Sequence, residues 1–289
     1  MNEEVKHFVV QRVRAHRCEE RQDALVVEEP LEIRLNNIPL AVVMRTPGYD
    51  FDLARGFLLT EGVFQEQKAN GKKQTANSGE WVNIHIDHAR DELGLEIPNV
   101  VNCHLPSFSA AEISGWQRHI FSSSSCGICG RASIDRVRVQ SPQPPGRWQI
   151  PFVKLQELPA KLREHQNNFS STGGLHAAAL FSSDSEIVLV REDVGRHNAV
   201  DKILGWAMRE NKLPLESYGL LVSGRLSFEL VQKALLGGIA FVAGISAASS
   251  LAVELAEEAG MTLVGFLRGE TAVVYSNAHR IEFGKEGQS

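Results

Sequence analysis

The sequence has little cysteine and no excess of positive charge. Of its 289 residues, 4 are cysteine, 30 are lysine or arginine and 35 are aspartate or glutamate, which gives a net charge of −5. So few cysteines in a chain of this length argue against a secreted disulfide scaffold, and we expect a cytoplasmic protein. The absence of a basic excess argues against a general nucleic-acid binder.

Long apolar runs are also scarce. The first twenty residues carry charges throughout and contain no apolar core of a secretory signal. One uncharged stretch, residues 234–253, has about the length of a membrane span. Gly237-Gly238 and the Ser246–Ser250 run interrupt it, so we interpret it as a helix end, a buried strand, a loop and a helix start. We therefore expect no contact with a membrane.

The first part of the chain predicts a mobile polar tail over residues 1–21 and a small α+β domain over residues 22–120. In that domain, EEPLEIRLNNIPLAVVMRTP is typical of a hairpin that turns at Asn36-Asn37. DFDLARGFLLTEG follows as a short helix that Asp50 or Asp52 could cap. WVNIHIDHA has the alternation of a strand.

The rest of the chain predicts a loop and proline-rich linker over residues 121–150 and an α/β domain over residues 151–285. Apolar segments such as EIVLVRED, YGLLVSG, IAFVAGIS and MTLVGFLRG alternate with amphipathic helical segments. This alternation indicates a mostly parallel sheet with helices on both faces. The predicted fold class is therefore α/β.

Small residues and arginines follow four of the predicted strands. Because ligands of open α/β sheets bind outside the carboxyl ends of the strands, these loops are candidate binding elements. Glycine- and serine-rich turns that open helices bind anions, and arginine adds bidentate phosphate contacts. The arginines are Arg196, Arg225 and Arg268, with His197 beside the first. No P-loop or GxGxxG pattern accompanies them.

The chain carries one Cys-x-x-Cys pair, Cys126 and Cys129, in FSSSSCGICGR. A zinc site would need two more ligands, for which Cys103, His104 and His176 are available. A thioredoxin-like redox site would need a strand leading into the motif, whereas four serines precede it. The pair could also be inert, or it could provide a reactive thiol on a mobile arm. Flanking glycines and a following positive helix end favour the thiolate, which can carry sulfane sulfur as a persulfide.

Five blocks of sequence resemble the FdhD family, the accessory sulfurtransferases of formate dehydrogenase. The blocks are CGICG, TGGLHAAAL, EDVGRHNAVDKILG, SGRLSFELVQKALLGGI and SAASSLAVELAEEAGMTLVGFLRG. The resemblance implies a second domain with the three-layer α/β/α fold of cytidine deaminases, and a homodimer. It also implies transfer of sulfur from a cysteine desulfurase to the molybdenum bis(molybdopterin guanine dinucleotide) cofactor, a bound substrate destined for formate dehydrogenase.

The resemblance assigns roles to residues by position. Cys126 corresponds to the persulfide carrier, and we treat Cys129 as auxiliary. The cofactor-contacting stretch corresponds to Phe266, Leu267, Arg268, Gly269, Glu270 and Thr271, with Arg225, Arg196 and His197 as further candidates. We expect Arg268 to contact a phosphate and Phe266 to pack against the ligand.

No metal ligands are assigned and no zinc is expected. Zinc of the deaminase type in particular is not expected, although the deaminase fold is. That chemistry needs His-x-Glu and Pro-Cys-x-x-Cys, but Ala178 replaces the glutamate and no proline precedes Cys126. Two further hypotheses stay open: a non-catalytic chaperone of the molybdenum cofactor with a structural Cys-x-x-Cys, and a thiol–disulfide redox protein. The first predicts tightly held zinc, and the second predicts a reversible Cys126–Cys129 disulfide.

Overall fold

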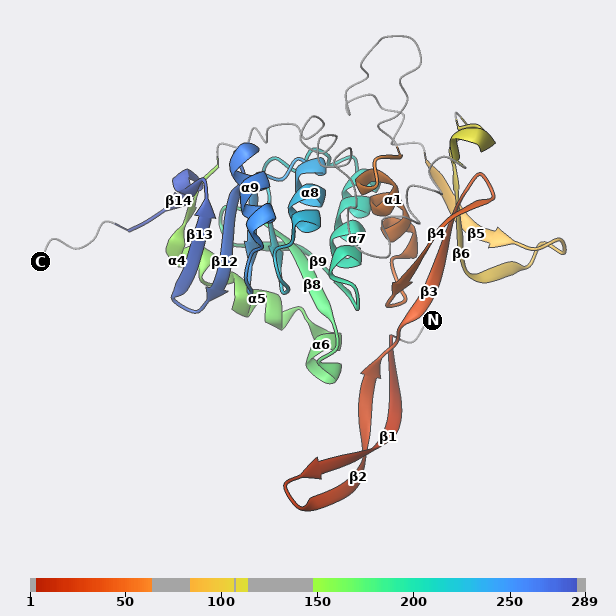
Figure 1. Cartoon of the computed structure of the whole chain (residues 1–289), viewed down its shortest axis with the longest axis horizontal. Coiled ribbons are helices and arrows are strands. Elements are labelled where there is room, and N and C mark those ends of the chain that lie inside the picture. Colours follow the sequence, from red (N-terminus) through yellow and green to blue (C-terminus); the bar gives the residue numbers. More distant parts are fainter. Residues whose placement is uncertain (1–3, 64–83, 107, 114–147, 285–289) are drawn as a thin grey trace, which may run out of the picture.

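A computed structural model describes residues 4–63, 84–106, 108–113 and 148–284 (Figure 1). Two parts of the chain each have a hydrophobic core, and an N-terminal hairpin projects from them. The strands are β1 (Val5–Arg14), β2 (Arg17–Val26), β3 (Glu29–Leu35), β4 (Ile38–Arg45), β5 (His85–Arg90), β6 (Glu96–His104), β7 (Ile150–Pro151), β8 (His176–Phe181), β9 (Ile187–Asp193), β10 (Gly219–Val222), β11 (Phe241–Gly244), β12 (Thr262–Arg268), β13 (Thr271–Ser276) and β14 (Ile281–Glu282). The helices are α1 (Asp50–Thr60), α4 (Phe152–Leu155), α5 (Leu158–Glu164), α6 (Asn167–Thr172), α7 (Arg196–Arg209), α8 (Phe228–Leu236), α9 (Ser250–Glu258) and the 3-10 turn Ala278–Arg280.

The larger part is built on a six-stranded sheet in the order β13-β12-β11-β10-β8-β9. Strands β9, β10, β11 and β12 run in one direction, but only β10–β11 and β11–β12 are hydrogen-bonded parallel pairs. The expectation of a mostly parallel sheet is therefore wrong. Strand β8 lies between β9 and β10 and is antiparallel to both, and β13 returns antiparallel along β12. The sheet is mixed, within the expected α/β class.

Helices cover both faces of this sheet, as predicted. Helices α7, α8 and α9 pack on one face through a large aliphatic core that includes Leu180, Leu220 and Leu263. Helices α4 and α5 contribute to the core on the other face, which contains Phe181 and Phe241. The alternation of Ala177, Ala178, Ala179, Leu180 and Phe181 between the two cores shows why β8 is apolar throughout.

The smaller part is a four-stranded sheet in the order β4-β3-β6-β5, with α1 packed on its apolar face. The β3–β4 turn is the predicted one, since Asn36 and Asn37 have φ values of 50° and 66°. Strand β6, absent from the sequence prediction, pairs in parallel with β3. The strand predicted from Trp81 is described only from residue 84 onward, and Ile84 and Ile86 are buried there.

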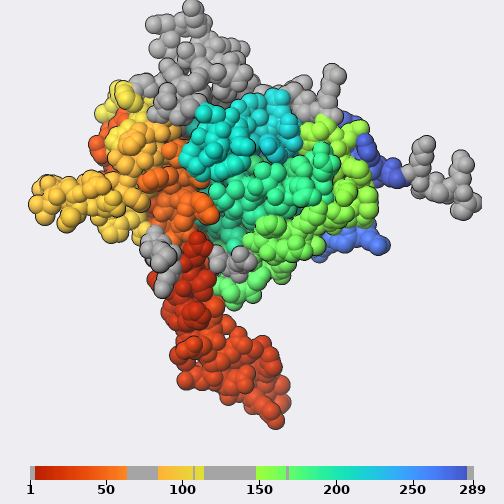
Figure 2. Space-filling model, turned by 180° about the vertical axis from the view of Figure 1, so that it is seen from behind, coloured from red at the N-terminus to blue at the C-terminus, as the bar shows by residue number. Residues whose placement is uncertain are grey.

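Residues 5–26 form an antiparallel hairpin where the sequence predicted a polar tail up to residue 21. Figure 2 shows this hairpin extending from the body of the molecule, with the base of β2 near α6. Its apolar residues Phe8, Val9, Val13 and Leu25 are exposed. The hairpin was not predicted because it has no buried face that would impose a clear polar–apolar alternation.

Helices α1 and α7 join the two parts of the chain through a pair of glycines. A methyl group on Gly56 would lie 1.9 Å from the carbonyl oxygen of Asp201, and one on Gly205 would lie 1.7 Å from that of Asp52. Each helix thus places a glycine against the backbone of the other helix. The expected capping role of Asp50 or Asp52 is wrong, because no side chain caps α1. The two carboxylates instead pair with Arg45 and Arg209.

The uncharged stretch of residues 234–253 is divided as predicted. It contains the end of α8, the buried strand β11 and the start of α9. Among the described residues, no helix combines the length and apolar character that crossing a bilayer requires.

Candidate binding rim at the sheet edge

The four predicted loops lie at one edge of the six-stranded sheet. Because β9, β10, β11 and β12 run in the same direction, their carboxyl ends meet there, together with the start of β8. The residues that line this edge form what we call the binding rim: His176, Arg196, His197, Ser223–Ser227, Ser246–Ser250 and Phe266–Thr271. The rim thus assembles segments that are far apart in the sequence.

Backbone hydrogen bonds connect neighbouring loops of the rim. Ile245 N donates to Val222 O over 3.1 Å, and Leu226 N donates to Ala247 O over 2.9 Å. Phe266 N donates to Ser246 O over 3.0 Å. The three loops that follow β10, β11 and β12 are therefore held in one arrangement by main-chain contacts.

Arg196 lies in the first turn of α7, beside His176 and Gly224. A methyl group on Gly224 would lie 3.4 Å from His176 Nδ1 and 3.7 Å from Arg196 Cδ, so the three residues adjoin. The Nε of Arg196 is buried and has no hydrogen-bond partner among the described residues. A buried guanidinium donor without a partner is costly, which makes this corner a candidate for an anionic ligand.

The two histidines of the rim add hydrogen-bonding capacity rather than charge. Burial, followed by the charges of Lys233 and Arg196, lowers the pKa of His197 to about 4. Burial and then Arg196 also lower the pKa of His176. Both imidazoles are consequently neutral at pH 7. His197 Nε2 lies 3.5 Å from Ser227 Oγ.

The predicted cofactor-contacting stretch turns from β12 into β13 around a bulge. Phe266 is exposed at a φ of 49°, and the guanidinium of Arg268 lies 5.6 Å from the centre of its ring. Arg268 Nε donates to Ile245 O over 2.9 Å. Leu267 points into the core and is fully buried, so only its backbone could reach a ligand.

The remaining candidates of this stretch, and Arg225 from the loop after β10, face solvent. Gly269 has a φ of 51°, a backbone conformation that favours glycine, and Glu270 and Thr271 are exposed beside it. Arg225 is exposed in the loop after β10. Arg196, Arg225 and Arg268 form no ion pair with any described carboxylate, so their charges are available to an anion.

Asp193 supports the rim and was not among the predicted site residues. It is fully buried at the end of β9, where it accepts hydrogen bonds from Gly195 N at 2.8 Å and Asn198 Nδ2 at 2.9 Å. Its other oxygen lies 2.7 Å from Nζ of the buried Lys202. These contacts fix the start of α7 and with it Arg196. The sequence signal was an acidic residue ending an apolar strand. Three of its partners belong to α7 and its N-cap, which follow at once, whereas Thr46, whose N donates to Asp193 Oδ2 at 3.3 Å, comes from a distant segment.

The cysteines divide into two groups. Cys126 and Cys129 lie outside the described residues, so their roles stay predictions. Cys103 is buried on the core side of β6, and burial raises the pKa of its thiol to about 12. A thiol held protonated in this way is a poor metal ligand or sulfur nucleophile. Cys18 is exposed on the hairpin.

Comparison with known proteins connects this geometry to a family. Residues 26–282 match the model of the FdhD/NarQ family. The chain is 48% identical to the sulfur carrier protein FdhD of Nocardia farcinica, with 90% of this chain and 89% of that protein covered. The protein of the same name from Streptomyces avermitilis is 49% identical over 93% of both chains.

Similarity extends to an archaeal relative and to a solved structure. The sulfur carrier protein FdhD of Saccharolobus solfataricus is 38% identical, with 97% of this chain and 100% of that protein covered. A crystal structure from Desulfotalea psychrophila, of a chain described as a candidate formate dehydrogenase accessory protein, superimposes with a TM-score of 0.71 at 20% identity. That match covers 96% of this chain and 99% of the other, and it supports the fold. On the family match and these identities, the chain belongs to the FdhD/NarQ family.

Proposed function

We propose that this chain is a cytoplasmic sulfur carrier that serves formate dehydrogenase, with Cys126 as the carrier and the binding rim as the cofactor site. Relatives named sulfur carrier protein FdhD, at up to 49% identity over nearly the whole chain, support the sulfur-carrying part. The observation that supports the cofactor part is the rim itself. Three arginines unpaired with described carboxylates lie there, and one has a buried donor without a described partner.

The substrate proposed for the rim is the molybdenum bis(molybdopterin guanine dinucleotide) cofactor. Its phosphates suit the guanidinium groups of Arg196, Arg225 and Arg268, which can donate bidentate hydrogen bonds. Phe266 offers an exposed ring against which a planar base can pack. The neutral imidazoles of His176 and His197 can each donate or accept a hydrogen bond without adding positive charge beside the arginines.

The proposed sulfur transfer balances through the two cysteines. The Cys126 thiolate attacks the outer sulfur of a cysteine desulfurase persulfide, and the desulfurase cysteine leaves as a thiolate. Cys126 then carries the sulfane sulfur as a persulfide. Attack by the Cys129 thiolate on Cys126 Sγ would form a disulfide and release the outer sulfur as sulfide. The dithiol supplies the two electrons of that reduction, and the sulfide becomes a ligand of the cofactor metal.

Sulfur loading of Cys126 is the first prediction. Incubation with an active cysteine desulfurase and cysteine should increase the intact mass of the protein by one or more sulfur atoms, and a reductant should remove the increase. Cys126→Ala should show no such increase and should leave the client dehydrogenase inactive, whereas Cys18→Ala should behave as the wild type. A wild-type chain that gains no sulfur would contradict the carrier role and favour a chaperone of the cofactor instead.

Anion binding at the rim is the second prediction. Arg196→Met should weaken the binding of GDP, a probe for the nucleotide half of the cofactor, by about 10- to 100-fold, as expected for a lost charged hydrogen bond. Isothermal titration calorimetry measures the change. Arg90→Met serves as the control and should leave the affinity unchanged. Arg90 lies on β5, the edge strand of the small sheet, and forms an exposed ion pair with Glu96 of β6. Equal affinities in both variants would argue against a phosphate at Arg196.

A further inference from the structure

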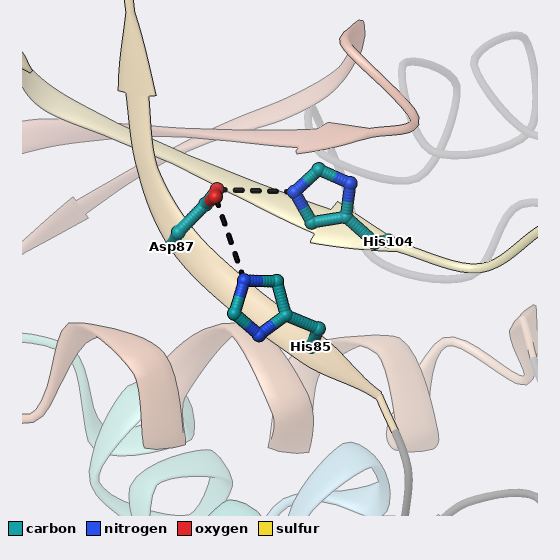
Figure 3. Close-up of side chains that lie close together, drawn as sticks. All are labelled: His85, Asp87 and His104. Carbon is teal, nitrogen blue, oxygen red and sulfur yellow. Dashed lines mark hydrogen bonds and ion pairs between the residues drawn. The ribbon is translucent and has the colours of Figure 1, made fainter.

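A group of metal-ligating side chains lies away from the rim, on the small sheet. His85 and Asp87 of β5 and His104 of β6 lie close together on adjacent strands (Figure 3). The two imidazole rings adjoin, with centroids 5.3 Å apart, and the Asp87 carboxylate lies to one side of both. The register explains the arrangement. His85 lies opposite His104, and Asp87 lies opposite Asn102, two residues along each strand and on the same face.

The distances within this group are those of a potential metal site. His104 Nε2 lies 3.1 Å from Asp87 Oδ1, and His85 Nε2 lies 3.6 Å from Asp87 Oδ2. All three ligand atoms lie within 4.8 Å of one another. Ligand atoms about 2.0–2.2 Å from a tetrahedral zinc ion are roughly 3.3–3.6 Å apart. The His85–Asp87 distance falls in that range, and the His104–Asp87 distance is slightly shorter.

The ring nitrogen of His104 that faces Asp87 has a second polar neighbour in Asn102. The amide orientation of Asn102 is fixed, because its Oδ1 accepts from Asn37 N at 2.8 Å and its Nδ2 donates to Asn37 Oδ1 at 2.9 Å. The same Nδ2 lies 3.1 Å from His104 Nε2, on which the Asp87 carboxylate also converges. Nε2 cannot both accept from the amide and donate to the carboxylate. In the tautomer whose Nε2 lone pair is free, a cation bound there would lie beside the Asp87 carboxylate and would replace the hydrogen bond from the Asn102 amide.

We propose that His85, Asp87 and His104 bind a divalent first-row metal ion, with zinc favoured by the two imidazoles and one carboxylate. Three protein ligands leave a fourth position for water. The ion would fasten β5, an edge strand of the small sheet, to β6. This site is distinct from the deaminase-type zinc whose motif the chain lacks, and it takes no part in the proposed sulfur transfer.

The test must separate this site from the thiols. In the full chain carrying Cys18→Ser, Cys126→Ser and Cys129→Ser, zinc competition with a chromophoric chelator should reveal one site. His104→Gln and His85→Gln in that background should weaken zinc binding by about 100-fold or more, since loss of an outer-shell partner alone costs roughly 10- to 100-fold. His88→Gln, on the same strand but outside the group, should retain the affinity.

A second readout checks the structural role. Zinc should raise the thermal midpoint of the chain without exposed thiols, and the increase should be lost in His104→Gln. The three side chains are exposed or half-buried, so these substitutions leave the core intact. Absence of a zinc-binding step, or undiminished affinity in His104→Gln, would overturn the proposal without affecting the sulfur-carrier function.

Discussion

Gly205→Ala is expected to destabilise the protein by about 3 kcal/mol or more, because the added methyl group has no space. It would lie 1.7 Å from the carbonyl oxygen of Asp52, which belongs to the backbone of α1 and cannot move aside as a side chain could. The higher helix propensity of alanine returns only about 1 kcal/mol. The two helices would have to separate along their whole contact. Urea unfolding followed by circular dichroism measures the loss.

Two comparisons make this expectation specific. Gly56→Ala should have a similar effect, because its methyl group would meet the Asp201 carbonyl oxygen at 1.9 Å. Gly284→Ala, where a methyl group would have no neighbour within 4 Å, should be nearly neutral. If Gly205→Ala were as stable as Gly284→Ala, the close approach of α1 and α7 would be wrong.

Lys202→Met is expected to lower the free energy of unfolding by about 3–5 kcal/mol, since it leaves the Asp193 carboxylate buried without its cation. Lys202 and Asp193 are 1% and 0% exposed, and their charged atoms lie 2.7 Å apart. The lysine also donates to Thr46 O at 3.0 Å, which ties β9 and α7 to the segment after β4. The same substitution should weaken GDP binding, because Asp193 fixes the start of α7 at the rim.

The matched control is Lys154→Met. Lys154 pairs with Glu157 at 3.8 Å, but the two side chains are 48% and 41% exposed, so the loss should be below about 1 kcal/mol. Adding Asp193→Asn to Lys202→Met should recover part of the stability, since it removes the unpaired charge. A loss for Lys202→Met no greater than that of the control would show that the buried pair contributes little.

The sequence was sufficient for features whose cause is local. Asn36-Asn37 predicted a turn because these residues tolerate positive φ, and the alternation of apolar segments predicted the order of strands and helices from β8 to β12. The position of the rim followed as well, because loops after strands of common direction must meet at one edge. Features that depend on distant partners were missed. Strand β6 contains Pro98 and Asn99, and only its pairing with β3 and β5 makes it a strand.

The candidate site was predictable in part for the same reason. The motif around Arg196 and the stretch from Phe266 stand out in the sequence, but burial decides which side chains can reach a ligand. Leu267 is turned into the core by the strand's alternation. Asp193, Lys202 and Thr46 are brought together only by folding, as are the three residues of the proposed metal site. No spacing along one segment could have revealed these groups.

The way in which the rim loops are joined has a consequence for how the site can change through evolution. The hydrogen bonds between the loops after β10, β11 and β12 run mainly from backbone to backbone, as at Leu226 and Ala247. Main-chain contacts are largely insensitive to which side chains the loops carry. Substitutions at exposed rim positions such as Arg225 can therefore alter the ligand that is selected without rebuilding the frame. One scaffold of this kind could serve relatives that recognise different anionic cofactors.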